Sequence, residues 1–140
     1  MDAYHLGFRK RHEYDPAKDG ISLEVTLRLW PLMKKVPVKV DPGSTFCIFQ
    51  REVGEDLGID IDTGWPQRIG TMTGSFLTYG HDVTLETLGY SFDTMVYFAE
   101  YHGLPRNVVG RYGWMQRFRL GLVDYDGELY LSDYNESVEL

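Results

Sequence analysis

The sequence has a single cysteine, Cys47, among its 140 residues. One thiol forms no disulfide within the chain and supplies no cysteine-built zinc site. Cys47 stands in the apolar run of residues 46–49, which predicts a buried packing residue rather than a nucleophile. Residues 1–15 lack the apolar core of a signal peptide, so a reducing cytoplasm is the expected location.

Positive charge and long apolar runs are also scarce. Lys and Arg number 14 against 21 Asp and Glu, the formal net charge is −7, and no basic stretch is long enough to follow a phosphate backbone. We therefore expect no nucleic-acid partner, and we interpret the basic run at residues 9–11 as a solvated cluster near a frayed N-terminus. No apolar run approaches the roughly 18 residues of a membrane span, so no membrane partner is expected.

The four histidines show no spacing typical of metal ligands. His5, His12, His81 and His102 form no HxxxH pattern, so surface or hydrogen-bonded roles are expected and no metal or cofactor is predicted. Ser44 has no histidine base that the sequence places beside it, which argues against a serine hydrolase.

Apolar alternation with a period of two is what the sequence has in abundance. Residues 21–29, ISLEVTLRL, alternate without a fault, as a half-buried strand does. Trp30-Pro31 ends this strand, and residues 36–40 predict a second one, in which Pro37 suggests a sheet edge or a bulge. Further alternation predicts strands near residues 83–87, 90–98, 118–122 and 129–131, with a hairpin turn at Asp126-Gly127.

Helical signals are few. Residues 50–56 fit a short helix that stops at Gly58, and residues 111–117 fit one or two helical turns. Residues 68–79, RIGTMTGSFLTY, carry two glycines among threonines and apolar residues, as a β-hairpin does. Many short strands with glycine turns predict one all-β domain, a barrel or a sandwich.

Asp41 ends the second predicted strand, in the segment VDPGS. On local grounds Pro42 and Gly43 fit the two central positions of a type II turn, and Asp41 is then a turn residue only. The wider sequence supports a second interpretation, because the glycine hairpin follows and the segment NVVGR, residues 107–111, comes later still.

In their order and spacing these segments resemble the retropepsins, the single-domain aspartic proteases of the retroviral type and their bacterial relatives. That family has an apolar strand ending in Asp-Thr/Ser-Gly-Ala/Ser, then a flap hairpin, then an apolar-apolar-Gly motif followed by arginine and a short helix. The matching segments are residues 40–44 for the first element, 70–80 for the flap, Val108, Val109, Gly110 and Arg111 for the last motif, and WMQRF at 114–118 for the helix. The resemblance covers about residues 21–132 of a single 1–140 domain.

The resemblance implies a retropepsin-like closed β-barrel, the acid protease fold, that acts as a homodimer on a peptide or protein substrate. Asp41 of each chain would be the catalytic residue that activates water, without a metal or cofactor, and Pro42, Gly43 and Ser44 would support it. The implied flap residues are Thr71, Met72, Thr73, Gly74 and Ser75.

Three positions differ from the family pattern. Pro42 stands where the family has Thr or Ser, and proline has neither the hydroxyl that bridges the dimer nor a backbone N–H. Thr45 stands where the retroviral enzymes carry an aspartate that pairs with the arginine, and Tyr112 follows Arg111 in place of Asp or Asn. A catalytically impaired pseudo-protease that binds a peptide in the same cleft is therefore an alternative, and a small β-barrel with an unrelated role is another.

A second tripeptide, Asp62-Thr63-Gly64, has the family's own sequence in other surroundings. Trp65-Pro66 follows it, where the family has Ser or Ala and an apolar run, and the flap candidate begins only six residues after Gly64. We interpret Asp62 as part of a loop with a turn.

Overall fold

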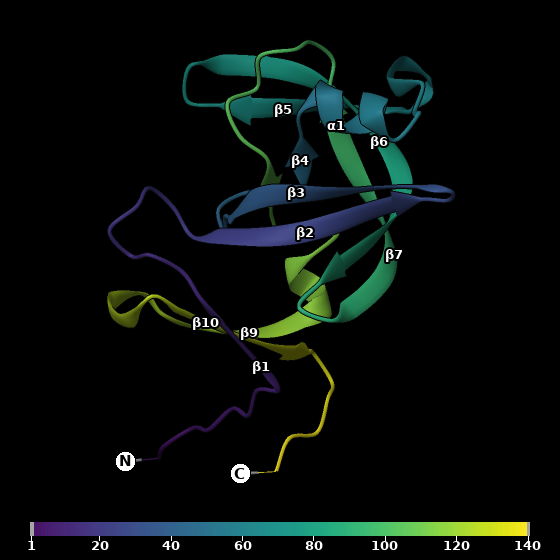
Figure 1. The fold of residues 1–140 in the computed structure, drawn as a ribbon. Helices are drawn as coiled ribbons and strands as arrows, with labels where there is room; N and C mark the ends of the chain where they lie inside the picture. Colours follow the sequence, from purple (N-terminus) through teal and green to yellow (C-terminus); the bar gives the residue numbers. More distant parts are fainter. Residues whose placement is uncertain (1, 140) are drawn as a thin grey trace.

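The computed structural model describes residues 2–139 and consists mainly of β-strands in two sheets (Figure 1). The strands are β1 (Lys10–Glu13), β2 (Ser22–Leu29), β3 (Leu32–Val40), β4 (Ile48–Phe49), β5 (Trp65–Thr71), β6 (Gly74–Thr87), β7 (Tyr90–Ala99), β8 (Val108–Val109), β9 (Phe118–Val123) and β10 (Glu128–Asp133). The helical segments are α1 (Arg51–Asp56) and the 3₁₀ turns η1 (Ile61–Thr63), η2 (Met115–Arg117) and η3 (Asp124–Asp126).

The larger sheet contains seven strands and returns on itself. Its order is β2-β3-β8-β4-β7-β6-β5, and β2 pairs a second time with β6, at Thr26↔Glu86, Leu27↔Leu85 and Arg28↔Thr84. The strands therefore form a ring. The all-β architecture expected from the alternation is confirmed.

The core lies inside this ring because successive strand residues point to opposite faces. Leu23, Val25 and Leu27 of β2 are buried, with the period of two read from the sequence, and Val36, Val38 and Val40 of β3 continue the pattern. Full burial of one such side chain contributes about 1.5–3 kcal/mol. The apolar side of β3 is thus fixed up to Val40, the residue that precedes Asp41.

The smaller sheet has the order β1-β10-β9 and lies at the end of the ring where both chain termini are drawn (Figure 1). Strand β1 pairs with β10 from Lys10↔Leu131 to Glu13↔Glu128, and Arg9 lies 3.4 Å from Glu136. The expectation of a frayed terminus at residues 9–11 is wrong, because a strand far along the chain pairs with this segment. Leu129 and Leu131 of β10 are fully buried.

The helical predictions are confirmed at α1 and, in a shorter form, at η2. Helix α1 is followed by Gly58 at a φ of 74°, as the predicted stop requires. Residues 111–117 contain the three-residue 3₁₀ turn η2, which is the one helical turn expected there, and the closing helix does not extend over all of WMQRF. Trp114 is instead buried before η2, and Phe118 already begins β9. Among residues 2–139 no helix is long and apolar enough to cross a bilayer.

Candidate active site

Asp41 directly follows β3, and its backbone is held on both sides. Its N–H donates to the carbonyl of Val109 (3.0 Å), and its carbonyl accepts from the N–H of Ser44 (3.0 Å), which closes a turn over Pro42 and Gly43. The turn is not of the expected type II, because Gly43 has no positive φ. The exposed Asp41 carboxylate accepts the Gly43 N–H through Oδ1 (2.9 Å), a contact favoured by Asp at the first position of a type I turn.

Gly110 explains why this turn is rigid. The next residue, Arg111, donates its N–H to the Ser44 carbonyl (2.9 Å), and Tyr112 donates to the Thr45 carbonyl (2.8 Å). A Cβ at position 110 would lie 2.4 Å from the Ser44 oxygen and 2.5 Å from the Phe46 oxygen. Only glycine permits this approach, so the segment that follows β8 clamps the chain just beyond Asp41.

The remaining residues of the apolar-apolar-Gly motif and the arginine after it differ in burial and contacts. Val109 is fully buried, Val108 is partly exposed, and both pair in parallel with the end of β3 at Lys39↔Val108 and Val40↔Val109. The Arg111 guanidinium lies 5.8 Å above the ring of Tyr112. Thr45 stands where an aspartate partner for Arg111 was expected, and the Arg111 side chain makes this cation–π contact instead.

Cys47 packs beneath the same loop. It is fully buried, and burial raises the pKa of its thiol to about 12. Its Sγ accepts the Gly110 N–H (3.4 Å) and donates to the Tyr112 carbonyl (3.4 Å). The prediction of a packing residue rather than a nucleophile is confirmed.

The predicted flap is the hairpin of β5 and β6, with Met72 and Thr73 between Thr71↔Gly74. Strand β6 pairs with β7 only from Thr78↔Ala99 onward. The segment 71–76 is therefore paired only within the hairpin and projects beyond the ring, whereas the Leu77 carbonyl already accepts the Glu100 N–H (3.0 Å). The Met72 side chain is fully exposed at the tip.

A cavity of about 250 Å³ lies between this hairpin and the turn of Asp41. Asp41 and Ser44 line one wall, Ile69 and Thr71 of β5 line the opposite wall, and Arg106 borders it before β8. The structure thus brings Asp41, the hairpin and Val108 around one space. Of the five predicted flap residues only Thr71 lines it. Met72 and Thr73 form the tip, and Gly74 and Ser75 pair with Thr71 and Gly70 without lining the cavity.

Asn107 is a site residue that the sequence analysis missed. It is 6% exposed, and its Oδ1 accepts the backbone N–H of Gln50 (2.8 Å) at the start of α1. The Gln50 side chain in turn donates to the Leu104 carbonyl (2.8 Å). These bonds hold the segment before β8 against α1, where Leu104 and Arg106 border the cavity. The sequence signal that could have indicated this role is the position of Asn107, a polar residue directly before Val108 and Val109.

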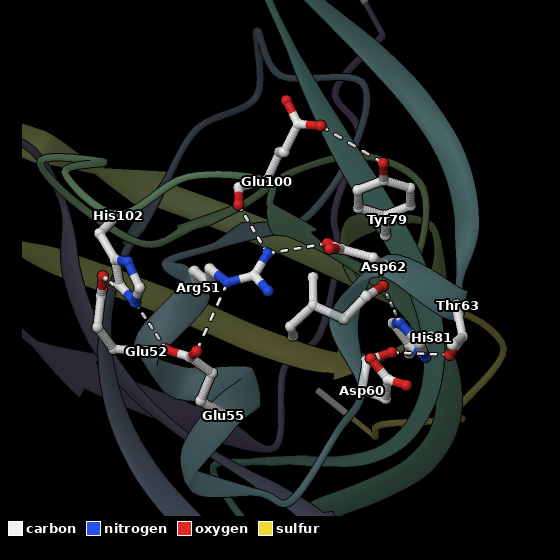
Figure 2. Close-up of polar contacts among 11 residues, drawn as sticks. Arg51, Glu52, Glu55, Asp60, Asp62, Thr63, Tyr79, His81, Glu100 and His102 are labelled. Atoms are coloured by element: carbon white, nitrogen blue, oxygen red, sulfur yellow. Dashed lines mark hydrogen bonds and ion pairs between the residues drawn. The ribbon is translucent and has the colours of Figure 1, made fainter.

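Asp62 lies in a different environment, in the turn η1. Figure 2 shows Arg51 of α1 at the centre of a network, with Nη1 donating to the Asp62 carboxylate (3.0 Å) and to the Glu100 carbonyl (2.6 Å). The hydrogen bond to Asp62 raises the pKa of Arg51. His81 of β6 contacts the carbonyl of Ile61 (2.8 Å), and His102 lies 2.7 Å from Glu55. The interpretation of Asp62 as a loop residue is confirmed.

No protein-family model and no curated protein matches the sequence. Among solved structures, EIAV protease complexed with the inhibitor HBY-793 superposes with a TM-score of 0.55 and 18% identity, over 70% of this chain and 88% of that one. A retropepsin-like aspartic protease from Rickettsia conorii superposes with a TM-score of 0.59 and 17% identity, over 79% and 89% of the two chains. The chain therefore has the retropepsin-like fold of aspartic proteases, as its motifs predict.

Proposed function

We propose that the chain is an aspartic endopeptidase that acts as a homodimer, with Asp41 of each chain forming the catalytic pair. The observation that carries this proposal is one cavity that is lined both by Asp41, at the end of β3, and by residues of the β5–β6 hairpin. One chain supplies one such carboxylate, and two-fold association is the simplest way to complete the pair.

The chemistry of the pair follows from its charge. Two carboxylates held close together share one proton, because both cannot ionise easily. The charged carboxylate accepts a proton from the attacking water, and the protonated one polarises the peptide carbonyl. A proton then passes to the leaving amine.

Other residues of the site orient these groups. The Gly43 N–H holds one oxygen of Asp41 at 2.9 Å, and the contacts of Arg111 and Ser44 hold the turn. The hairpin is suited to close over an extended peptide and to exclude water from it. Thr71 is the hydroxyl residue of the hairpin that lines the cavity.

The two-fold axis of such a dimer passes beside the turn of Asp41. Asp41, Pro42 and Gly43 are all exposed, and Tyr112, which bonds to the Thr45 carbonyl, keeps 47% of its surface exposed. The exposed proline and the exposed aromatic side chain are apolar surface that a dimer could bury.

A second candidate function is peptide binding without cleavage, and Pro42 favours it. Pro42 offers neither a hydroxyl nor an N–H to a partner across the axis. Ser44 does not replace the missing hydroxyl, because its Oγ already donates to the Phe46 carbonyl (2.7 Å). In this case the dimer would hold a peptide segment under the hairpin and release it intact.

Sedimentation velocity combined with a peptide-library assay between pH 3 and pH 7 tests both functions. For the peptidase we expect a dimer at micromolar concentration, cleavage that is fastest at acidic pH, and specific activity per chain that rises with concentration. A strict monomer that cleaves nothing would remove the enzyme hypothesis. A dimer that retains peptides uncut would favour the second function.

A further inference from the structure

A second cavity, of about 240 Å³, adjoins the one that contains Asp41. Arg106 lines both cavities, and Lys39 of β3 lines the second. No Asp or Glu lines the second cavity, although the chain carries a net charge of −7. Gln50 and Asn107 also line it, and their amide groups donate to the carbonyls of Leu104 and Pro37.

Two other cavities of the molecule are lined by carboxylates as well as cations. The cavity between β2, β3 and the β6–β7 turn combines Lys35 with Glu24 and Glu86. The groove beside Trp30 combines Arg28 and Arg117 with Asp82 and Asp93. Of these three cavities, only the one next to Asp41 is lined by cations and by no carboxylate.

The two cations are weakly compensated. Arg106 Nη2 lies 3.3 Å from Asp19 Oδ2, in a pair whose side chains are 48% and 85% exposed, and such exposed pairs are weak and screened by salt. Lys39 Nζ donates to the backbone carbonyl of Asp19 (2.7 Å) and to Ser22 Oγ (2.8 Å), both of which are neutral. Within residues 2–139, Lys39 has no carboxylate at ion-pair distance.

We infer that this cavity binds a side-chain carboxylate of the substrate, so that the substrate class is peptides with Asp or Glu close to the cleaved bond. The inference rests on the proposed function. A guanidinium whose acid partner is largely exposed and an ammonium without an acid partner suit a carboxylate, which Arg can bind through two parallel hydrogen bonds. Leu104 and Val108 on the wall of the Asp41 cavity suit an apolar neighbour in the same peptide.

The position of the acidic residue follows from the register of β3. Lys39 and Asp41 are two residues apart at the end of one strand, so their Cα atoms are about 7 Å apart. An extended peptide advances by about the same distance over two residues. The acidic side chain therefore lies within about two residues of the cleaved bond.

Matched peptides that differ only by Glu, Gln or Lys at these positions test the inference. We expect wild type to cleave the Glu peptide with a kcat/KM about tenfold above that of the Gln peptide at pH 6, equivalent to about 1.4 kcal/mol. The preference should shrink at pH 3.5, because a Glu side chain with a pKa of about 4.3 is then mostly protonated.

Variants assign the preference to Arg106. Arg106→Leu should abolish the difference between Glu and Gln peptides, and Arg106→Glu should favour Lys peptides. Asp19→Asn should strengthen the Glu preference by freeing the guanidinium. Arg9→Leu is a matched control, because Arg9 is 56% exposed and pairs with Glu136 at 3.4 Å in the terminal segment; it should keep the wild-type preference.

The outcomes separate this inference from the proposed function. Equal cleavage of Glu and Gln peptides by wild type, or a Glu preference that survives Arg106→Leu, would overturn the inference and leave the peptidase intact. If no peptide is cleaved, the peptidase fails, and fluorescence anisotropy of the same peptides then decides. Tighter binding of the Glu peptide that Arg106→Glu removes would uphold the carboxylate site, and equal binding would overturn it.

Discussion

Asp41-Pro42-Gly43 and Asp62-Thr63-Gly64 are two short turns of similar composition in very different surroundings. The first follows a strand that is buried on one side, and Asp41 lines a cavity together with residues of the β5–β6 hairpin. The second is a 3₁₀ turn after α1, and its carboxylate is paired with Arg51 at 3.0 Å. The comparison shows that the strand before an aspartate and the wall opposite it define a candidate site better than the tripeptide does.

The glycines of the two turns differ in the same way. A Cβ on Gly64 would lie 2.4 Å from His81 Nε2 and 2.5 Å from the Gly80 carbonyl, because this turn is packed on β6. A Cβ on Gly43 would meet only Asp41 Oδ1, at 3.2 Å. The glycine beside Asp41 therefore borders open space, and the one beside Asp62 is needed for packing.

The largest expected effect comes from removing each carboxylate in turn. Asp41→Asn should lower kcat/KM by at least about a hundredfold, since general acid–base catalysis contributes about 10²–10⁴-fold. Asp62→Asn should leave peptide cleavage nearly unchanged, because it weakens only the contact to Arg51. Cleavage that survives Asp41→Asn would refute the assignment of the catalytic residue.

Stability distinguishes the glycine that clamps the turn from the glycine within it. Gly110→Ala should cost about 1–3 kcal/mol of unfolding free energy, the usual range for overpacking, because the added carbon meets two backbone oxygens. Gly43→Ala should lower the Tm much less, since Gly43 has no positive φ and its Cβ has space. Equal losses of Tm in thermal unfolding would show that the clamp at Gly110 is not the rigid contact described.

Exchanging the middle residues of the two turns gives a smaller effect. Pro42→Thr should raise activity by no more than about tenfold, because one hydrogen bond between neutral groups contributes about 0.5–1.5 kcal/mol and about 1.4 kcal/mol is tenfold in rate. Thr63→Pro should leave cleavage unchanged while removing the bonds from Thr63 to the Asp60 carbonyl. If neither the wild type nor Pro42→Thr cleaves a peptide, the binding-only function is favoured.

The smallest expected effect is a difference in amide hydrogen exchange between two parts of the same strand, β6. Amide hydrogen exchange should be faster at residues 74–76 of β6, which pair only with β5, than at residues 84–86, which pair with both β2 and β7. Adding a peptide substrate to the Asp41→Asn variant should slow exchange at 71–77. Protection of residues 71–79 equal to that of the core strands would contradict their role as a mobile flap.

The ring strands could be predicted because their signals are local. The alternation at residues 21–29 reports directly which side chains of β2 are buried, and glycines mark the hairpin of residues 68–79. The turn at Asp41 was also predicted. Its type was predicted wrongly, because the Gly43 N–H donates to the Asp41 side chain and Gly43 has no positive φ. Order and spacing of three weak motifs then indicated the retropepsin-like fold.

Contacts between distant segments could not be predicted. Lys10–Glu13 has no strand pattern of its own and is ordered by β10, more than a hundred residues later. The closing helix was expected from the family resemblance, but burial of Trp114 and the start of β9 at Phe118 leave room for only one 3₁₀ turn. The hydrogen bond between Gln50 and Asn107 likewise joins residues that are far apart in the sequence, so local patterns do not reveal it.

Subunit mixing tests most directly the claim that two Asp41 residues form one site. Wild type is mixed with an excess of Asp41→Asn chains and allowed to exchange subunits, and a parallel mixture contains Asp62→Asn. We predict that activity per wild-type chain falls toward zero in the first mixture, because most wild-type chains then share a site with one carboxylate, and stays constant in the second. Activity per wild-type chain that is unchanged by excess Asp41→Asn chains would contradict a catalytic pair built from two copies of Asp41.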